Sequence, residues 1–260
     1  MIKYADFKLD STFLTRFRGL QPEWGPIGYF TYKRTYARPL EEGGTEEFWQ
    51  TCQRVVEGVY RLQKAHCLQH NLPWSDTKAQ RSAMEMYERM WSFKWLPPGR
   101  GLWVMGTDVV ETKGGAALNN CAFVSTKDLD RDFTGPFTFL MDMSMLGVGV
   151  GADTLGTGMV DIITPRIGDY TYVVEDSREG WVNLIRLVLL AYIGEEELPK
   201  EIDYSLLRKK GEPLKQFGGY SSGPGPLKEL VANIQRVLTI KEEDLIQPIT
   251  TAQIVDIFNY

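Results

Sequence analysis

Cys121 opens an apolar, strand-forming run, Cys121–Ser125, directly after two asparagines. A cysteine thiol can carry redox chemistry, or it can simply fill space in a core. The other two cysteines, Cys52 and Cys67, fall on one predicted helix. They lie roughly 22 Å apart at 1.5 Å of rise per residue, which is too far for a disulfide. We interpret those two as small helix residues, and the sequence leaves both interpretations of Cys121 open.

Glycines crowd the segment Gly147–Gly158, which follows Cys121 after one predicted helix. Gly151 and Gly156 have the spacing of a Walker A loop, but Thr157-Gly158 stands where that loop needs Lys followed by Ser or Thr. The dinucleotide-binding fingerprint also fails, because its glycines must lie between a strand and a helix. Glycines inside a strand indicate close approach of a backbone or of a ligand, and both alternatives stay open.

Three other patterns carry weaker indications of chemistry. His66 and His70 have a spacing that zinc ligands can use, but no further ligand completes the set, so we predict no metal site. With both histidines on this one helix, a Ser-His-Asp triad has no support. The loop Gly218–Pro224 leads into a helix N-terminus, where it could bind an anion or be an ordinary capped loop.

Length and charge limit the classes of protein to which the chain can belong. The chain has 260 residues, enough for one large domain or two small ones, and a formal net charge of −5. The acidic balance argues against a nucleic-acid partner. No apolar run approaches the roughly 18 residues of a membrane span, and the charged N-terminus is unlike a signal peptide. We therefore expect a soluble, cytoplasmic protein without a membrane partner.

The first third of the chain is expected to be helical after an irregular arm over residues 1–44. Thr45 is a good N-cap for an amphipathic helix that runs to about Gln69. Ser75-Asp76 should cap a second helix, which Pro97-Pro98-Gly99 ends. We predict that the two helices pack as an antiparallel pair.

After Gly99 short β-prone runs alternate with helical ones, which is typical of an α/β fold. Strands are predicted over 102–105, 121–126, 148–151, 170–174 and 202–207. Helices are predicted over 133–146 and from near Ser177, Ser222 and Thr251. The last helix carries an apolar face to the end of the sequence, so we expect further residues to complete this domain.

Four segments together resemble one known family, in the family's order. They are Tyr32-x-x-Thr35-Tyr36-x-Arg38, Leu96-Pro97-x-Gly99-Arg100-x-Leu102-Trp103-Val104-x-Gly106-Thr107, Leu118-Asn119-Asn120-Cys121 and Phe217-Gly218-Gly219-Tyr220-Ser221-Ser222-Gly223-Pro224. The family is the monomeric type of adenosylcobalamin-dependent (class II) ribonucleotide reductase. The resemblance covers essentially the whole chain and corresponds to the N-terminal half of the family.

The resemblance implies a fold. Residues 1–98 would be an N-terminal arm and helical domain. Residues 99–260 would be the first half of a ten-stranded α/β barrel, with an effector-site insertion at about 170–212. That insertion would imitate a dimer partner, so no homodimer is expected. The second redox cysteine, the thiyl-radical cysteine with its glutamate, and most of the adenosylcobalamin site would lie beyond these residues.

The resemblance also implies site residues. Cys121 would be one of two cysteines that reduce the ribose and end as a disulfide, with Asn120 and Gly149 beside the substrate. A dNTP effector would be bound by Lys127, Asp128, Arg131, Gly151, Asp153, Lys215, Gln216 and Phe217. One departure affects the phosphate contacts: related dimeric reductases have an arginine after the glycine-rich strand, whereas this chain has Ala152-Asp153-Thr154.

The function implied is the N-terminal part of a ribonucleoside-triphosphate reductase, an allosteric enzyme that makes deoxyribonucleotides for DNA synthesis. Its partners would be a ribonucleoside triphosphate, a dNTP effector, the C-terminal half of the reductase and a thioredoxin-type reductant. By itself the chain is not expected to be a competent enzyme. It could be a split half, a fragment or truncated gene, or a nucleotide-binding module without catalysis.

Overall fold

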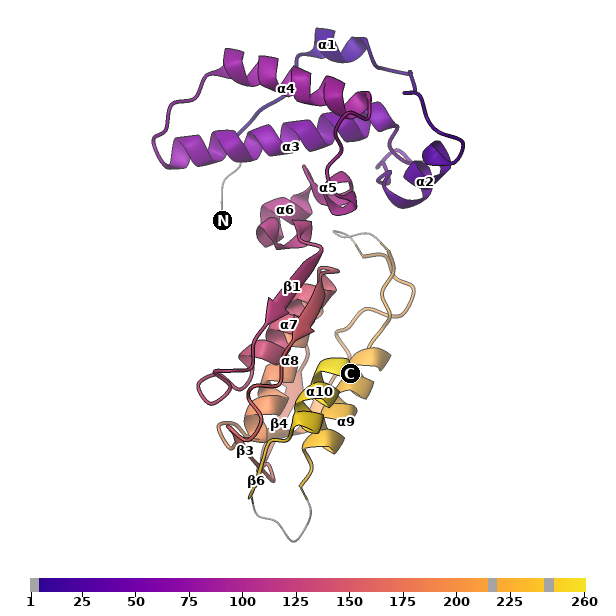
Figure 1. The fold of residues 1–260 in the computed structure, drawn as a ribbon. Coiled ribbons are helices and arrows are strands. Elements are labelled where there is room, and N and C mark those ends of the chain that lie inside the picture. The colour runs from indigo at the N-terminus through magenta and orange to yellow at the C-terminus, as the bar shows by residue number, and fades with distance from the viewer. Residues whose placement is uncertain (1–4, 215–218, 241–245) are drawn as a thin grey trace. The chain divides into compact units, whose positions relative to one another are not determined.

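The computed structural model describes residues 5–214, 219–240 and 246–260 and divides the chain into two compact units (Figure 1). The first unit is Met1–Asn119 and the second is Asn120–Tyr260. The division falls later than the predicted boundary between residues 98 and 99, because the short helices that follow Gly99 pack within the first unit. Among the described residues, no helix is long and apolar enough to cross a membrane.

Two long helices form the centre of the first unit. They are α3 (Phe48–Gln69) and α4 (Asp76–Trp91), and they pack together as the predicted antiparallel pair. Their shared core includes Phe48, Cys52, Ala83, Tyr87 and Met90. Ser75 caps α4, as predicted, by accepting the Lys78 N–H on its hydroxyl.

The N-cap predicted for α3 was wrong. Thr45 pairs as an isolated β-bridge with Pro39, so its backbone is extended before the helix begins. Glu47 is the N-cap instead, and it forms a capping box with Gln50. The arm over 1–44 is also less irregular than predicted. It contains α1 (Ser11–Thr15), capped by Asp10, and α2 (Gly28–Thr35).

The strand predicted over 102–105 is a helix. Residues 102–104 lie in α5 (Gly99–Val104), and Met105 is its C-cap. Helix α6 (Asp108–Lys113) and the 3₁₀ helix η1 (Gly114–Leu118) follow. The reason is tertiary: the Arg54 guanidinium on α3 donates to the carbonyls of Leu102 at 2.7 Å and Met105 at 2.5 Å. A cation at a helix C-terminus satisfies carbonyls that the helix leaves free.

The second unit mixes helices with short strands, so the α/β class is confirmed at this level. Among its described residues there are three two-stranded sheets. Strands β1 (Cys121–Val124) and β2 (Gly149–Ala152) are parallel, as are β4 (Ile167–Val173) and β5 (Leu198–Asp203). The pair β3 (Asp161–Ile163) and β6 (Ile246–Pro248) is antiparallel. All but β3 and β6 lie near predicted strands.

A helix connects the two strands of each parallel pair, as a parallel connection requires. They are α7 (Gly135–Met145) between β1 and β2, and α8 (Arg178–Ala191) between β4 and β5. With α9 (Gly225–Leu238) and α10 (Thr251–Asn259) they enclose a core that includes Leu184, Val188, Leu189, Ile234 and Ile254. The four helices lie where the sequence predicted helices.

The strand predicted over 202–207 starts earlier and ends at Asp203. Its carboxylate accepts the Ser205 N–H at 2.8 Å and the Ser205 hydroxyl at 3.0 Å, which turns the chain out of the strand. Leu207 is buried in the core from the turn that follows, and not from a strand. The apolar side chain of Leu207 is therefore explained by burial and not by strand pairing.

Candidate functional site

The β1–β2 pair presents Cys121 on an open face. Cys121 is directly paired with Gly149, and Phe123 is paired with Gly151. Side chains of a strand alternate between faces, so the cysteine and the phenylalanine share one side. Cys121 is exposed and Phe123 is 64% exposed. The thiol is free and has only glycine beside it on the neighbouring strand.

Helix α7 covers the opposite face of this pair. It contacts both strands, and Figure 1 shows it running alongside them. Ala122 and Val150, which alternate with the exposed residues, are half-buried, and Leu146 and Val148 at the end of α7 are buried. The apolar connection between the strands therefore fixes which face is left open, and it is the face of Cys121.

Packing within the chain does not require glycine at positions 149 and 151 of β2. A Cβ added to Gly149 would lie 3.7 Å from the Asn120 carbonyl oxygen, and one on Gly151 would lie 3.6 Å from the Phe123 ring. Both are ordinary contact distances. Gly156 differs, since its Cβ would lie 2.6 Å from the Thr126 carbonyl oxygen. Of the two alternatives for this segment, tight packing applies to Gly156, whereas Gly149 and Gly151 leave room for a ligand.

Asn120 joins the same strand pair through its backbone. Its carbonyl accepts the Gly149 N–H at 3.0 Å, and its side chain is exposed. Asn120, Cys121 and Gly149 are therefore neighbours, as the assignment of all three to the substrate side requires. Sequence reasoning placed them together only through the resemblance, because the spacing alone does not reveal the strand register.

The loop after β1 carries five exposed charged residues, and they include the three predicted to bind the effector: Lys127, Asp128 and Arg131. The Asp128 carbonyl accepts the N–H groups of Arg131 and Asp132, which closes a turn. Within the described part of the chain, no side-chain hydrogen bond or ion pair engages these three. Their charges remain available to a ligand at the carboxyl end of β1, the edge where ligands of parallel sheets bind.

Asp153 follows β2 and is bound by its own chain. Its Oδ1 accepts the Thr126 N–H at 2.8 Å, the Thr126 hydroxyl at 2.7 Å and the Leu155 N–H at 3.3 Å. Burial would raise the pKa of Asp153, but hydrogen bonds from Ser125, Thr126 and Leu155 outweigh it and lower the pKa to about 2. The carboxylate is therefore ionised at neutral pH.

Ser125 and Thr126 were missed by the sequence reasoning. Thr126 is fully buried, and its hydroxyl also accepts the Gly156 N–H at 2.9 Å. Polar residues immediately after a strand are the one indication that could have drawn attention to them.

The effector residues predicted at Lys215, Gln216 and Phe217 lie outside the described residues. The segments that flank them approach each other: Pro213 forms a β-bridge with Tyr220, and the Leu214 N–H donates to the Gly219 carbonyl at 2.9 Å. Tyr220 is 76% exposed. Beyond it, the Ser221 hydroxyl accepts the Gly223 N–H at 3.0 Å, so a side chain binds part of the loop before α9.

The other cysteines and the histidines belong to the helical unit. Cys52 lies in its core, where burial raises the pKa of the thiol. Cys67 is half-buried on α3, and the His66 and His70 rings contact each other with centroids 4.4 Å apart and planes tilted by 47°. Among the described residues, no group of three His, Cys, Asp or Glu side chains could hold a metal ion.

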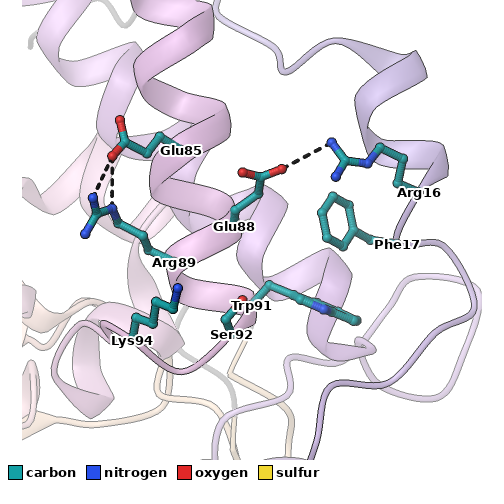
Figure 2. Close-up of a pocket in the computed structure, with 8 residues that line it drawn as sticks. All are labelled: Arg16, Phe17, Glu85, Glu88, Arg89, Trp91, Ser92 and Lys94. Carbon is teal, nitrogen blue, oxygen red and sulfur yellow. Dashed lines mark hydrogen bonds and ion pairs between the residues drawn. The ribbon is translucent and has the colours of Figure 1, made fainter.

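A cavity of about 440 Å³ opens in the helical unit beside the end of α4 (Figure 2). Arg16 pairs with Glu88 at 3.1 Å, and Arg89 pairs with Glu85 at 2.7 Å. Roughly half of each of these side chains is exposed to solvent, so the pairs contribute little to stability. The carboxylates in the cavity are thus already matched by neighbouring arginines. Nothing in this arrangement indicates a reaction, and the Cys121 face is the better candidate site.

Comparisons with known proteins match parts of both units to ribonucleotide reductase domains. A model described as the ribonucleotide reductase alpha domain matches residues 9–107, and one described as the B12-dependent ribonucleotide reductase insertion domain matches 151–238. The second match contains the insertion predicted at about 170–212 and is wider than it.

Curated relatives and a solved structure agree with the family models. The chain is 41% identical to a probable adenosylcobalamin-dependent ribonucleoside-triphosphate reductase of Dictyostelium discoideum, covering 98% of this chain and 36% of the relative. It is 42% identical to the Euglena gracilis enzyme of that name, covering 97% and 35%. A crystal structure of a B12-dependent (class II) ribonucleotide reductase superposes with a TM-score of 0.79 at 28% identity, covering 98% of this chain and 42% of that one. The chain thus spans little more than a third of these curated relatives.

Proposed function

The chain belongs to the B12-dependent ribonucleotide reductase family, corresponding to its N-terminal portion, and from this premise we propose that it forms part of an adenosylcobalamin-dependent ribonucleoside-triphosphate reductase. The observation that carries the proposal is the open β1–β2 face, on which the exposed Cys121 thiol stands opposite Gly149. The second unit is then the first half of the ten-stranded barrel, and the open face is its interior side.

In this proposal Cys121 is a reductant. Cys121 and a second cysteine each give up one electron and one proton and join as a disulfide. The ribose 2′-hydroxyl leaves as water, and a hydrogen takes its place on C2′. The product is a 2′-deoxyribonucleoside triphosphate. A thioredoxin-type dithiol then exchanges with the disulfide and restores both thiols.

The second cysteine comes from outside these residues. Cys121 is the only cysteine in the sequence from residue 120 to 260. Cys52 lies in the core of the helical unit, and Cys67 belongs to α3 of the same unit. The relatives extend well beyond the matched part, and we assign to that extension the second redox cysteine, the radical cysteine and its glutamate.

The surface around Cys121 supports substrate binding. Gly149, the strand partner of Cys121, leaves open space beside the thiol, and Asn120 immediately precedes the cysteine in the sequence. A sugar placed there would meet the sulfur without a competing side chain from β2. Because catalysis requires the reacting atoms to come within contact distance, this space is where the ribose belongs.

Adenosylcobalamin supplies the radical that starts the reaction when it is bound. The resemblance places most of its binding surface beyond these residues. We assign its binding to the remainder of the reductase and derive no step through it.

A dNTP effector is bound, in this proposal, by the loop after β1. Lys127 and Arg131 are exposed cations that could meet its phosphates, and Asp128 could accept from the ribose hydroxyl. Gly151 would allow close approach, and Lys215, Gln216 and Phe217 would link effector to substrate. We further propose that the reductase is cytoplasmic and does not need a homodimer.

A nucleotide-binding module without catalysis is the alternative. It is favoured by the absence of a second cysteine from residues 120–260 together with the unengaged charges of the loop after β1. The two proposals differ in whether Cys121 is needed for function. They also differ in whether a preparation that contains the chain reduces ribonucleotides.

The intact mass of the protein from its native cells distinguishes them. We expect a covalent species several-fold heavier than 29.6 kDa, or a 29.6 kDa chain that co-purifies with a second polypeptide. Either preparation should reduce ribonucleoside triphosphates when supplied with adenosylcobalamin and a dithiol. A solitary 29.6 kDa protein that binds dNTPs without reducing any nucleotide would contradict the reductase and support the binding module.

A further inference from the structure

Asp153 ties the carboxyl ends of β1 and β2 together. The last residue pair of the ladder is Val124 with Ala152, and the residues after it diverge into separate loops. At this point the Asp153 carboxylate accepts both the N–H and the hydroxyl of Thr126. The two residues are 27 positions apart in the sequence, so the contact is tertiary.

The Thr126 hydroxyl extends the connection by one more bond. It donates to Asp153 and accepts the Gly156 N–H at 2.9 Å, and the backbone around Gly156 has no room for a Cβ. A hydroxyl can donate once and accept at the same time, so one buried side chain serves both loops. We call the set Asp153, Thr126 and Gly156 the loop clamp.

The loop clamp lies next to the charged residues proposed for the effector. Thr126 and Leu129 are both fully buried, and Lys127 and Asp128 are the two residues between them. Their backbone is therefore held at both ends while their side chains reach solvent. Any motion of Thr126 would displace Lys127 and Asp128 directly.

Asp153 is poorly suited to touch the nucleotide. Its Oδ1 already accepts from Thr126 and Leu155, and its charge would repel a triphosphate at close range. Hydrogen bonds to an ionised carboxylate are stronger than neutral ones, which suits a residue that fixes a backbone.

We propose that Asp153 is a positioning residue, which acts through Thr126 to hold Lys127 and Asp128 in place for the effector and does not contact the effector itself. This inference rests on the proposed function, because it concerns the same nucleotide site. It also changes the role that the sequence resemblance implied for Asp153.

Exchange of backbone amide hydrogens in the nucleotide-free chain tests the clamp. Asp153→Ala should speed exchange at Thr126 and Gly156 while leaving amides of α8 unchanged. Asp161→Ala is the matched control, since Asp161 is an exposed aspartate of β3 in the same unit. Unchanged exchange at Thr126 and Gly156 in the Asp153 variant would overturn the inference, whatever the nucleotide results.

Binding of each of the four dNTPs in turn tests positioning. Thr126→Val removes the hydroxyl at nearly constant volume and should weaken binding by about tenfold, whereas Thr126→Ser should restore the parent affinity. Asp153→Ala should weaken binding at least as much. The double variant Asp153→Ala, Thr126→Val should weaken it by less than the sum of the two losses, because the two residues share the bond between the Thr126 hydroxyl and the Asp153 carboxylate. Losses of dNTP affinity that add up in the double variant would contradict positioning. Faster amide exchange in a variant that keeps the parent affinity for dNTPs would contradict it as well.

The same measurements separate this inference from the proposed function. A parent chain that binds no dNTP would refute the proposed effector site, and with it the nucleotide part of the inference. The clamp would then be judged on the exchange rates, which need no nucleotide.

Discussion

Cys121 of β1 and Gly149 of β2 are directly opposed partners in a parallel strand pair, on the face that α7 leaves open. The pairing gives the thiol a neighbour without a side chain. Because Gly149 has space for a Cβ, the packing of the chain does not require a glycine there.

Cys121→Ser should abolish repeated turnover in the complete reductase and leave dNTP binding to this chain unchanged. A hydroxyl has nearly the shape of the thiol but cannot form the disulfide that supplies the electrons. Cys67→Ser is the control, because Cys67 is the partly exposed cysteine of the helical unit. Steady-state turnover and nucleotide binding are the two measurements. Undiminished turnover by the Cys121 variant would remove it from the mechanism.

Gly149→Ala and Gly156→Ala should differ in their effect on stability. At Gly149 a methyl group fits, so the free energy of unfolding should change by no more than about 0.5 kcal/mol. At Gly156 it meets the Thr126 carbonyl and Leu129, and overpacking should cost about 1–3 kcal/mol. Urea unfolding of the chain measures both. In the complete reductase, Gly149→Ala should instead raise the KM for the ribonucleotide.

Gly58→Ala and Gly106→Ala should destabilise the helical unit by about 1–3 kcal/mol each. A Cβ on Gly58 would lie 2.5 Å from the Gly106 Cα, and Gly106 has a φ of +75° and faces the Arg54 carbonyl. Gly115→Ala is the control, since nothing lies near its Cβ position. Thermal unfolding measures the Tm of the three variants. Equal Tm values for all three would contradict this packing.

Lys127→Ala and Arg131→Ala should each weaken dNTP binding by about tenfold, because each removes a charge that could bond to phosphate. Both side chains are exposed and unengaged by described residues, so the Tm should not change. Lys78→Ala, on the exposed side of α4, is the control and should change neither the dNTP affinity nor the Tm. Isothermal titration at two salt concentrations checks the charge dependence. Parent-like affinity in both loop variants would place the phosphates elsewhere.

Glu57 should make stability depend on pH. Burial raises the pKa of this carboxyl above 4.5, although hydrogen bonds from Gln53 and the Leu9 N–H oppose the shift. A raised folded-state pKa stabilises the fold below the unfolded pKa of 4.5, and that contribution is lost as the pH rises through the folded value. Glu57→Gln should therefore stabilise the protein at pH 7 relative to the parent, and less so at pH 4.

Urea unfolding at both pH values measures the Glu57 effect. Glu41→Gln serves as the control, since Glu41 is an exposed glutamate of the same unit. A Glu57 variant that is equally destabilised at pH 4 and pH 7 would contradict the raised pKa.

The sequence by itself determined the long elements and the family. Helices α3, α4, α7, α8, α9 and α10 were predicted because apolar residues at steps of three and four make a face that must be buried. Capping by Ser75 was equally local, since a serine hydroxyl can accept from a nearby N–H in the chain itself. The family was recognised from short segments in a fixed order.

Only the tertiary structure decided the short elements and the role of single polar residues. Residues 102–105 form a helix end because Arg54, far away in the sequence, binds their carbonyls. The resemblance implied a ligand contact for Asp153, and only the folded chain shows that Thr126 binds its carboxylate. A six-residue segment has too few internal bonds to fix its own conformation, and a carboxylate finds its partner only once the strands have paired. Contacts between distant residues therefore decide both.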